Sequence, residues 1–68
     1  MRYVVHLSEV PYSLPCRVIG KLQPRMWRVI VGVGIGHLDF GAEQDWPDED
    51  MPHEIRRPNA FFYVTDAD

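Results

Sequence analysis

Cysteine is almost missing from this sequence, which contains Cys16 alone among 68 residues. A single thiol excludes the internal disulfide framework that stabilises many small secreted domains. The N-terminus also lacks the short apolar stretch that is typical of a secretory signal. We therefore expect a reducing, cytoplasmic location.

Long apolar runs and long stretches without proline or glycine are missing as well. The longest apolar run, residues 27–35, is far shorter than the roughly 20 residues of a membrane-spanning helix, so we expect no membrane partner. Six prolines and five glycines leave no stretch of more than ten residues free of both. None of these stretches has the 3.6-residue apolar period of a helix. The sequence therefore predicts strands.

The composition is that of a globular protein, with 46% hydrophobic and 25% charged residues. The length predicts one domain, residues 1–68, because domains usually contain about 100–200 residues. A chain this short buries only about 60% of the surface that it exposes when unfolded. We expect marginal stability, which a homodimer would improve.

The clearest strand signal is an apolar alternation with a period of two over residues 26–35. The apolar face of this strand consists of Trp27, Val29, Val31, Val33 and Ile35. A second strand, residues 17–22, places Val18, Gly20 and Leu22 on one side. The turn Gln23-Pro24-Arg25 between them predicts an antiparallel hairpin, because proline fixes φ at the first central position of a turn.

Further strands are predicted at residues 2–7 and 60–65, with a short one at residues 38–40. Residues 8–15 read as an irregular loop, and residues 42–46 as a single helical turn. We therefore predict an all-β fold, a small antiparallel barrel or strongly bent sheet of four or five strands, SH3-like or OB-like. The competing interpretation is an open antiparallel meander that completes its core by dimerising.

Charge is distributed unevenly along the chain. Five cations and Glu9 give residues 1–36 a charge of +4, whereas two cations and nine acids give residues 37–68 a charge of −7. No lysine or arginine lies between Arg28 and Arg56, so no neighbour in sequence neutralises the acids there. We expect the two charged regions to lie on opposite sides of the fold, which leaves the negative one free to bind a partner.

The leading functional hypothesis rests on the acidic segment, which we define as residues 43–54. Carboxylates complement basic surfaces, and tryptophan is enriched at interface hot spots. We expect a non-enzymatic protein-binding module or small inhibitor that docks this segment on a basic partner surface, as a nucleic-acid mimic would. In size the chain is similar to small phage-encoded proteins that block host machinery. The candidate partner-binding residues are Glu43, Asp45, Trp46, Asp48, Glu49 and Asp50.

A simpler interpretation of the same segment is a solvated loop that keeps a small protein soluble. In that interpretation Trp46 folds back over the core.

The alternative function is nucleic-acid binding through the predicted hairpin. Its four cations, Arg17, Lys21, Arg25 and Arg28, are expected to cluster on one surface. Small barrels bind single strands with such basic grooves and with stacking aromatics. The sequence pI of about 5.4 is opposite to the basic footprint of those domains. A further interpretation is that this surface pairs with the acidic segment of the same chain or of a second copy.

No metal or cofactor is expected. His37, Asp39, His53 and Glu54 offer nitrogen and oxygen ligands, but structural zinc sites usually show four Cys or His ligands at regular spacing. Asp48 and Asp50 begin like a calcium loop, yet proline occupies the next ligand position.

Catalysis is not expected either. The spacing Gly32-x-Gly34-x-Gly36 is not the dinucleotide fingerprint. Cys16 could act as a nucleophile with His6, His37 or His53 as its base. A structural position in the core or at a sheet edge is the more common role for such a thiol.

Overall fold

The computed structural model describes residues 3–32 and 41–67. These residues form five strands and two short 3-10 helices. The strands are β1 (Tyr3–His6), β2 (Leu14–Gln23), β3 (Met26–Val31), β4 (Ala42–Pro47) and β5 (Phe61–Asp66). The 3-10 helices are η1 (Asp48–Asp50) and η2 (His53–Ile55). In the described part of the chain, no helix has the length and apolar character to cross a membrane.

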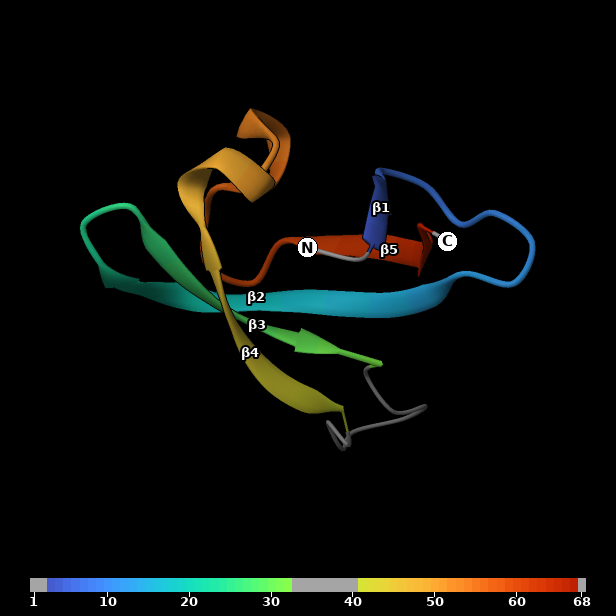
Figure 1. The fold of residues 1–68 in the computed structure, drawn as a ribbon, viewed down its shortest axis with the longest axis horizontal. Helices are drawn as coiled ribbons and strands as arrows, with labels where there is room; N and C mark the ends of the chain where they lie inside the picture. The colour runs from blue at the N-terminus through green and yellow to red at the C-terminus, as the bar shows by residue number, and fades with distance from the viewer. Residues whose placement is uncertain (1–2, 33–40, 68) are drawn as a thin grey trace.

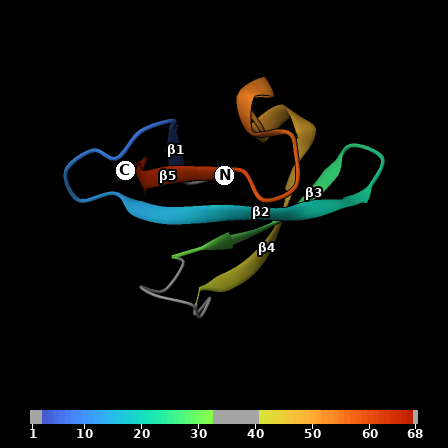
Figure 2. The same ribbon diagram turned by 180° about the vertical axis from the view of Figure 1, so that it is seen from behind.

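The strands form one antiparallel sheet in the order β1-β5-β2-β3-β4, curled into a half-barrel (Figures 1 and 2). The predicted all-β, strongly bent sheet is confirmed. β1 pairs with β5 from Tyr3 opposite Asp66 to His6 opposite Tyr63, so the two ends of the described chain lie side by side. The predicted strand at residues 38–40 and the end of the predicted strand 26–35 lie outside the described residues.

The expectation of a helical turn at residues 42–46 is wrong, because these residues form β4. Pairing with β3 runs without a register shift from Pro47 opposite Met26 to Ala42 opposite Val31. Trp46 is buried while Glu43 and Asp45 are exposed, which is the alternation of a half-buried strand. Burial of one large aromatic side chain against β3 thus outweighs the low strand propensity of the acidic residues.

The predicted β2–β3 hairpin is confirmed, but β2 begins earlier than expected, at Leu14. Residues 14–17 pair with β5, and residues 16–23 pair with β3. Two bulges interrupt the β2–β3 register, between Val18 and Gly20 and between Lys21 and Gln23. The expectation that Val18, Gly20 and Leu22 share one face is therefore wrong.

The cause of that error is the first bulge, because an extra residue moves the side chains that follow it to the other face. Val18 is fully buried opposite Val29, whereas Lys21 lies opposite the buried Trp27 and Leu22 is 43% exposed.

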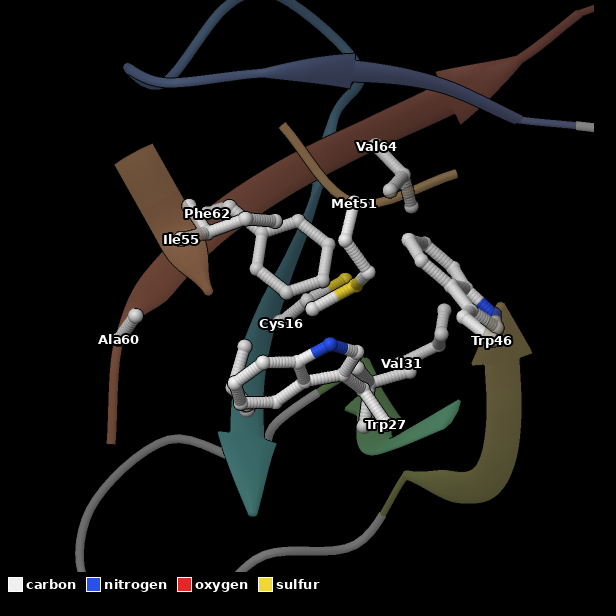
Figure 3. Packing of buried hydrophobic residues seen from close by; sticks show 11 residues of the cluster. Cys16, Trp27, Val31, Trp46, Met51, Ile55, Ala60, Phe62 and Val64 are labelled. Atoms are coloured by element: carbon white, nitrogen blue, oxygen red, sulfur yellow. The ribbon is translucent and has the colours of Figure 1, made fainter. Parts of the chain in front are cut away.

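The core fills the concave side of the half-barrel. Side chains from four strands and from the segment after η1 point toward one another there (Figure 3). The members are Cys16, Val18, Trp27, Val29, Val31, Trp46, Met51, Ile55, Ala60, Phe62 and Val64. Burying each large apolar side chain contributes about 1.5–3 kcal/mol. The concave face is therefore the main apolar face of the sheet. The convex face carries Arg17, Arg28, Glu43 and Asp45, and Ile30 is buried there as well.

Three aromatic rings join the two edges of the sheet across this core. Tyr3 of β1 stacks on Trp46 of β4 with ring centroids 6.2 Å apart. Trp46 also meets Phe62 of β5 at 5.4 Å in a tilted arrangement. Aromatic pairs at such separations contribute about 0.5–1.5 kcal/mol beyond the area that they bury. These contacts partly close the half-barrel.

Three turns of the protein share an unusual backbone conformation. In each, a proline precedes a residue other than glycine whose φ is positive. The three dipeptides are Pro11-Tyr12, Pro24-Arg25 and Pro58-Asn59, with φ values of 65°, 68° and 65° at the second residue. Positive φ at this position is typical of type II turns, which favour glycine or asparagine there. Tyr12 is the least suited of the three, and its side chain is fully exposed.

We expect the substitution Tyr12→Gly to stabilise the protein. Left-handed backbone costs a residue with a Cβ about 1–2 kcal/mol, whereas the greater freedom of glycine in the unfolded chain costs about 0.5–1 kcal/mol. The net gain of up to about 1 kcal/mol would raise the melting temperature by roughly 4–8 °C in a domain of this size. Thermal unfolding measures it. Tyr12→Ala removes the ring and keeps the strain, so an equal gain in that variant would contradict the explanation.

Candidate functional site

The acidic segment is an ordered part of the fold. It comprises most of β4, all of η1 and most of η2. The two 3-10 helices lie over the end of the sheet near the β2–β3 hairpin (Figures 1 and 2). Met51 and Ile55 are almost completely buried in the core (Figure 3). The interpretation of the segment as a solvated loop is therefore wrong for its backbone.

Trp46 is a core residue and does not project toward a partner. Its side chain is 3% exposed, and its indole Nε1 donates a hydrogen bond to Gln44 Oε1 at 2.9 Å. The expectation of an exposed tryptophan anchor is wrong, because the alternation of β4 directs position 46 to the concave face. The alternative, in which this ring covers the core, is confirmed.

Hydrogen bonds hold η1 in place from both sides. The Arg56 guanidinium donates from Nε to the Met51 carbonyl at 2.6 Å and from Nη2 to the Asp48 carbonyl at 2.8 Å. The Asp48 amide donates to the Arg25 carbonyl at 2.9 Å. Trp27 Nε1 donates to Asp48 Oδ1 at 2.6 Å. Asp48 therefore anchors η1 to the rest of the fold. The sequence does not indicate this role, because Trp27 lies 21 residues away.

The remaining carboxylates fall into two groups. Asp45 and Glu43 lie 3.1 and 3.8 Å from the guanidinium of Arg28 on the convex face. The expectation that the two charged regions lie on opposite sides of the fold is therefore wrong at Arg28, where the hairpin pairs with the acidic segment of the same chain. The hydrogen bond to Asp45 raises the pKa of Arg28. By contrast, no hydrogen bond or ion pair to the carboxylates of Glu49, Asp50 and Glu54 occurs within residues 3–32 and 41–67. Glu54 joins the candidate residues, since it lies in η2 beside the acids that the sequence pointed to.

The cations of the hairpin do not form one basic surface. Arg17 and Arg28 lie on the convex face, where Arg17 donates to Asn59 Oδ1 at 3.1 Å. Lys21 lies on the other face, with Nζ 5.6 Å from the centroid of the Trp27 ring. Arg25 stands at the turn. The expected cluster is therefore wrong, because the bulge after Val18 separates Lys21 from the arginines.

A hollow of about 320 Å³ lies between the hairpin turn and η1. Its lining consists of Arg25, Pro47, Asp48 and Glu49. One guanidinium and two carboxylates give it a mixed charge, and Asp48 is already engaged by Trp27. The hollow is thus suited to a polar side chain of a partner more than to an apolar ligand.

The other candidate residues are scattered through the described chain. Cys16 is fully buried, and desolvation raises the pKa of its thiol. His6 Nε2 lies 2.9 Å from Thr65 Oγ1, and His53 is exposed in η2. His37, Asp39, Gly34 and Gly36 lie outside the described residues. Among residues 3–32 and 41–67 no three His, Cys, Asp or Glu side chains gather as metal ligands. That the protein needs no metal, cofactor or catalytic residue stays a prediction.

We expect Asp48→Ala to destabilise the protein and Glu49→Ala to leave its stability almost unchanged. A hydrogen bond to a charged group contributes about 1.5–3 kcal/mol, and the Trp27 N–H would lose its acceptor in the first variant. Urea unfolding of the two variants measures the difference in free energy. Equal stabilities would show that the Trp27–Asp48 hydrogen bond does not hold η1.

Cys16 in the folded protein is expected to resist alkylation. The thiolate is the reactive form, and burial both raises the thiol pKa and excludes the reagent. Labelling by iodoacetamide at pH 8 should therefore proceed through the rare unfolded molecules, at least about 100-fold more slowly than in urea. Mass spectrometry over time measures both rates. Similar rates would place the thiol at an accessible position.

Comparisons with known proteins give no information about the function of this chain. The chain matches no protein family, no curated protein and no solved structure.

Proposed function

We propose that this protein is a non-enzymatic binding module that docks its acidic segment on the basic surface of a partner protein. Four exposed acids of the segment and one half-buried acid take this role: Glu43, Asp45, Glu49 and Glu54 are exposed, and Asp50 is half-buried. Trp46 and Asp48 are reassigned to the core and to the anchoring of η1. An inhibitor that occupies a surface evolved to hold nucleic acid is one form of this function, and the cytoplasm is the proposed location.

This proposal rests on an ordered backbone that presents the carboxylates of Glu49, Asp50 and Glu54, none of which has a hydrogen bond or ion pair within residues 3–32 and 41–67. Arg56, Trp27 and the buried Met51 hold η1, but none of them contacts the carboxylates of Glu49 and Asp50. These acids therefore contribute no ion pair to the described fold. Because the backbone is held before a partner arrives, binding need not order it, and the entropic cost of association falls.

The charge distribution favours a basic protein over nucleic acid as the partner. The net charge is −3, and Arg28 is engaged by Asp45 and Glu43. Lys21 and Arg17 lie on different faces, so no continuous basic groove follows the hairpin. Phosphate groups would meet repulsion from the acidic segment, whereas a basic surface would be attracted over several ångströms.

Charge reversal tests this function. The variant Glu49→Lys/Glu54→Lys changes two exposed side chains whose carboxylates have no hydrogen bond or ion pair within the described residues, so we expect an unchanged melting temperature. The immobilised wild type should retain a basic protein from a lysate of the producing cells, and this variant should retain at least tenfold less. Quantitative mass spectrometry of the retained proteins measures the difference.

The matched control is Glu9→Lys/Asp66→Lys, which has the same change in net charge. Glu9 belongs to the loop between β1 and β2, and Asp66 is the last residue of β5. This loop lies at the end of the sheet away from η1 and η2 (Figure 1). The control should retain the same protein as the wild type does. Equal losses in both double variants, or retention of no basic protein by the wild type, would overturn the proposal.

A further inference from the structure

β4 is an edge strand with a regular backbone. It lies last in the sheet order and, among the described strands, pairs with β3 alone. Its six residues pair with β3 without a bulge. An edge of this kind presents a row of unpaired N–H and C=O groups, to which another extended chain can add.

The register identifies which residues of β4 present those groups. The amide of Asp48 donates to the Arg25 carbonyl, which makes this opposed pair a hydrogen-bonded one. Hydrogen-bonded and non-hydrogen-bonded pairs alternate in an antiparallel ladder. Trp46 and Gln44 therefore bond to β3, whereas Asp45 and Glu43 direct their N–H and C=O groups outward.

Two further observations agree with this alternation. Pro47 has no N–H to donate. The alternation makes Pro47 and Met26 a non-hydrogen-bonded pair, so β3 requires no N–H from this residue. Met26 closes the two-residue hairpin opposite Gln23, so its own backbone groups point to β2 and not to Pro47.

Charge identifies what this edge can accept. The side chains of Glu43 and Asp45 are 57% and 43% exposed, and Arg28 contacts one oxygen of each. One guanidinium against two carboxylates leaves a net negative charge on the row. A second copy of β4 would bring acids against acids, which is destabilising. An extended segment that carries positive charge at the matching positions would be attracted.

We infer that the edge of β4 binds an extended basic segment of the partner as an added antiparallel strand. The two residues opposite Glu43 and Asp45 are arginine or lysine, and they are separated by one residue. Their side chains reach the carboxylates on the convex face, because directly opposed residues share a face. The intervening residue lies on the concave side beside Gln44. This inference rests on the proposed function and adds the mode of recognition, a basic-x-basic strand.

A short synthetic peptide, acetyl-Thr-Arg-Val-Arg-Thr-amide, tests the inference. In the free protein, the amides of Glu43 and Asp45 should exchange quickly with solvent and those of Gln44 and Trp46 slowly. Peptide at about nine times its dissociation constant should slow exchange at Glu43 and Asp45 roughly tenfold, because only unbound molecules then exchange. Nuclear magnetic resonance measures each amide separately. Slow exchange at Glu43 and Asp45 in the free protein would overturn the inference.

Two modified peptides separate strand addition from simple charge attraction. N-methylation of both arginine amides keeps the charge and removes the N–H donors, so we expect at least tenfold weaker binding. A peptide with adjacent arginines places them on opposite faces and should also bind at least tenfold more weakly. Equal binding of all three peptides would overturn the added strand.

Protein variants locate the site on the edge of β4. Glu43→Gln/Asp45→Asn should bind the peptide at least tenfold more weakly than Glu49→Gln/Glu54→Gln, although both lose two negative charges. If no peptide binds but the Glu49→Lys/Glu54→Lys variant loses its basic protein from the lysate, the inference fails and the proposed function stands. If the peptides bind as expected and that variant keeps its basic protein, the role proposed for η1 and η2 fails and the edge site stands.

Discussion

The burial of Trp46 determines how the second half of the molecule is arranged. Its ring contacts Tyr3 on the opposite edge of the sheet and Phe62 near the centre. With this side chain on the concave face, the alternation of β4 must place Asp45 on the convex face, where it meets Arg28. The same placement directs the chain into η1, where hydrogen bonds from Trp27 and Arg56 hold it. The burial of Trp46 thus determines where the exposed acids lie.

Much of the fold could be predicted from the sequence, because apolar alternation survives wherever the sheet is regular. The pattern from Trp27 to Val31 gave β3, and Pro24 marked the turn of the hairpin. The position of the bulges in β2 could not be predicted. Gly20 lies at the first bulge, but glycine within a strand indicates an irregularity without saying which neighbouring residue is left unpaired. β4 was missed because acidic side chains have low strand propensity, and its pairing with β3 is visible only in three dimensions.

The candidate site was predictable as a segment but not residue by residue. The run of acids between Arg28 and Arg56 is visible in the sequence itself. Which of these acids stabilise the fold and which are exposed depends on contacts between residues distant in sequence, such as the hydrogen bond from Trp27 to Asp48. The position of Trp46 depends on the alternation of β4, a strand for which the sequence predicts a helical turn. Sequence patterns therefore found where the charge lies, and packing decided which charges are available.

The pairing of β1 with β5 has a consequence for how the protein is made. Tyr3 lies opposite Asp66, and among the described strands β1 pairs with β5 alone. During synthesis from the N-terminus, the residues of β1 must leave the ribosome long before those that pair with them. β1 therefore remains unpaired until β5 has been synthesised. The sheet reaches its final strand order only after that step. Contacts between such distant parts of a chain also slow folding, because a long loop must close before they form.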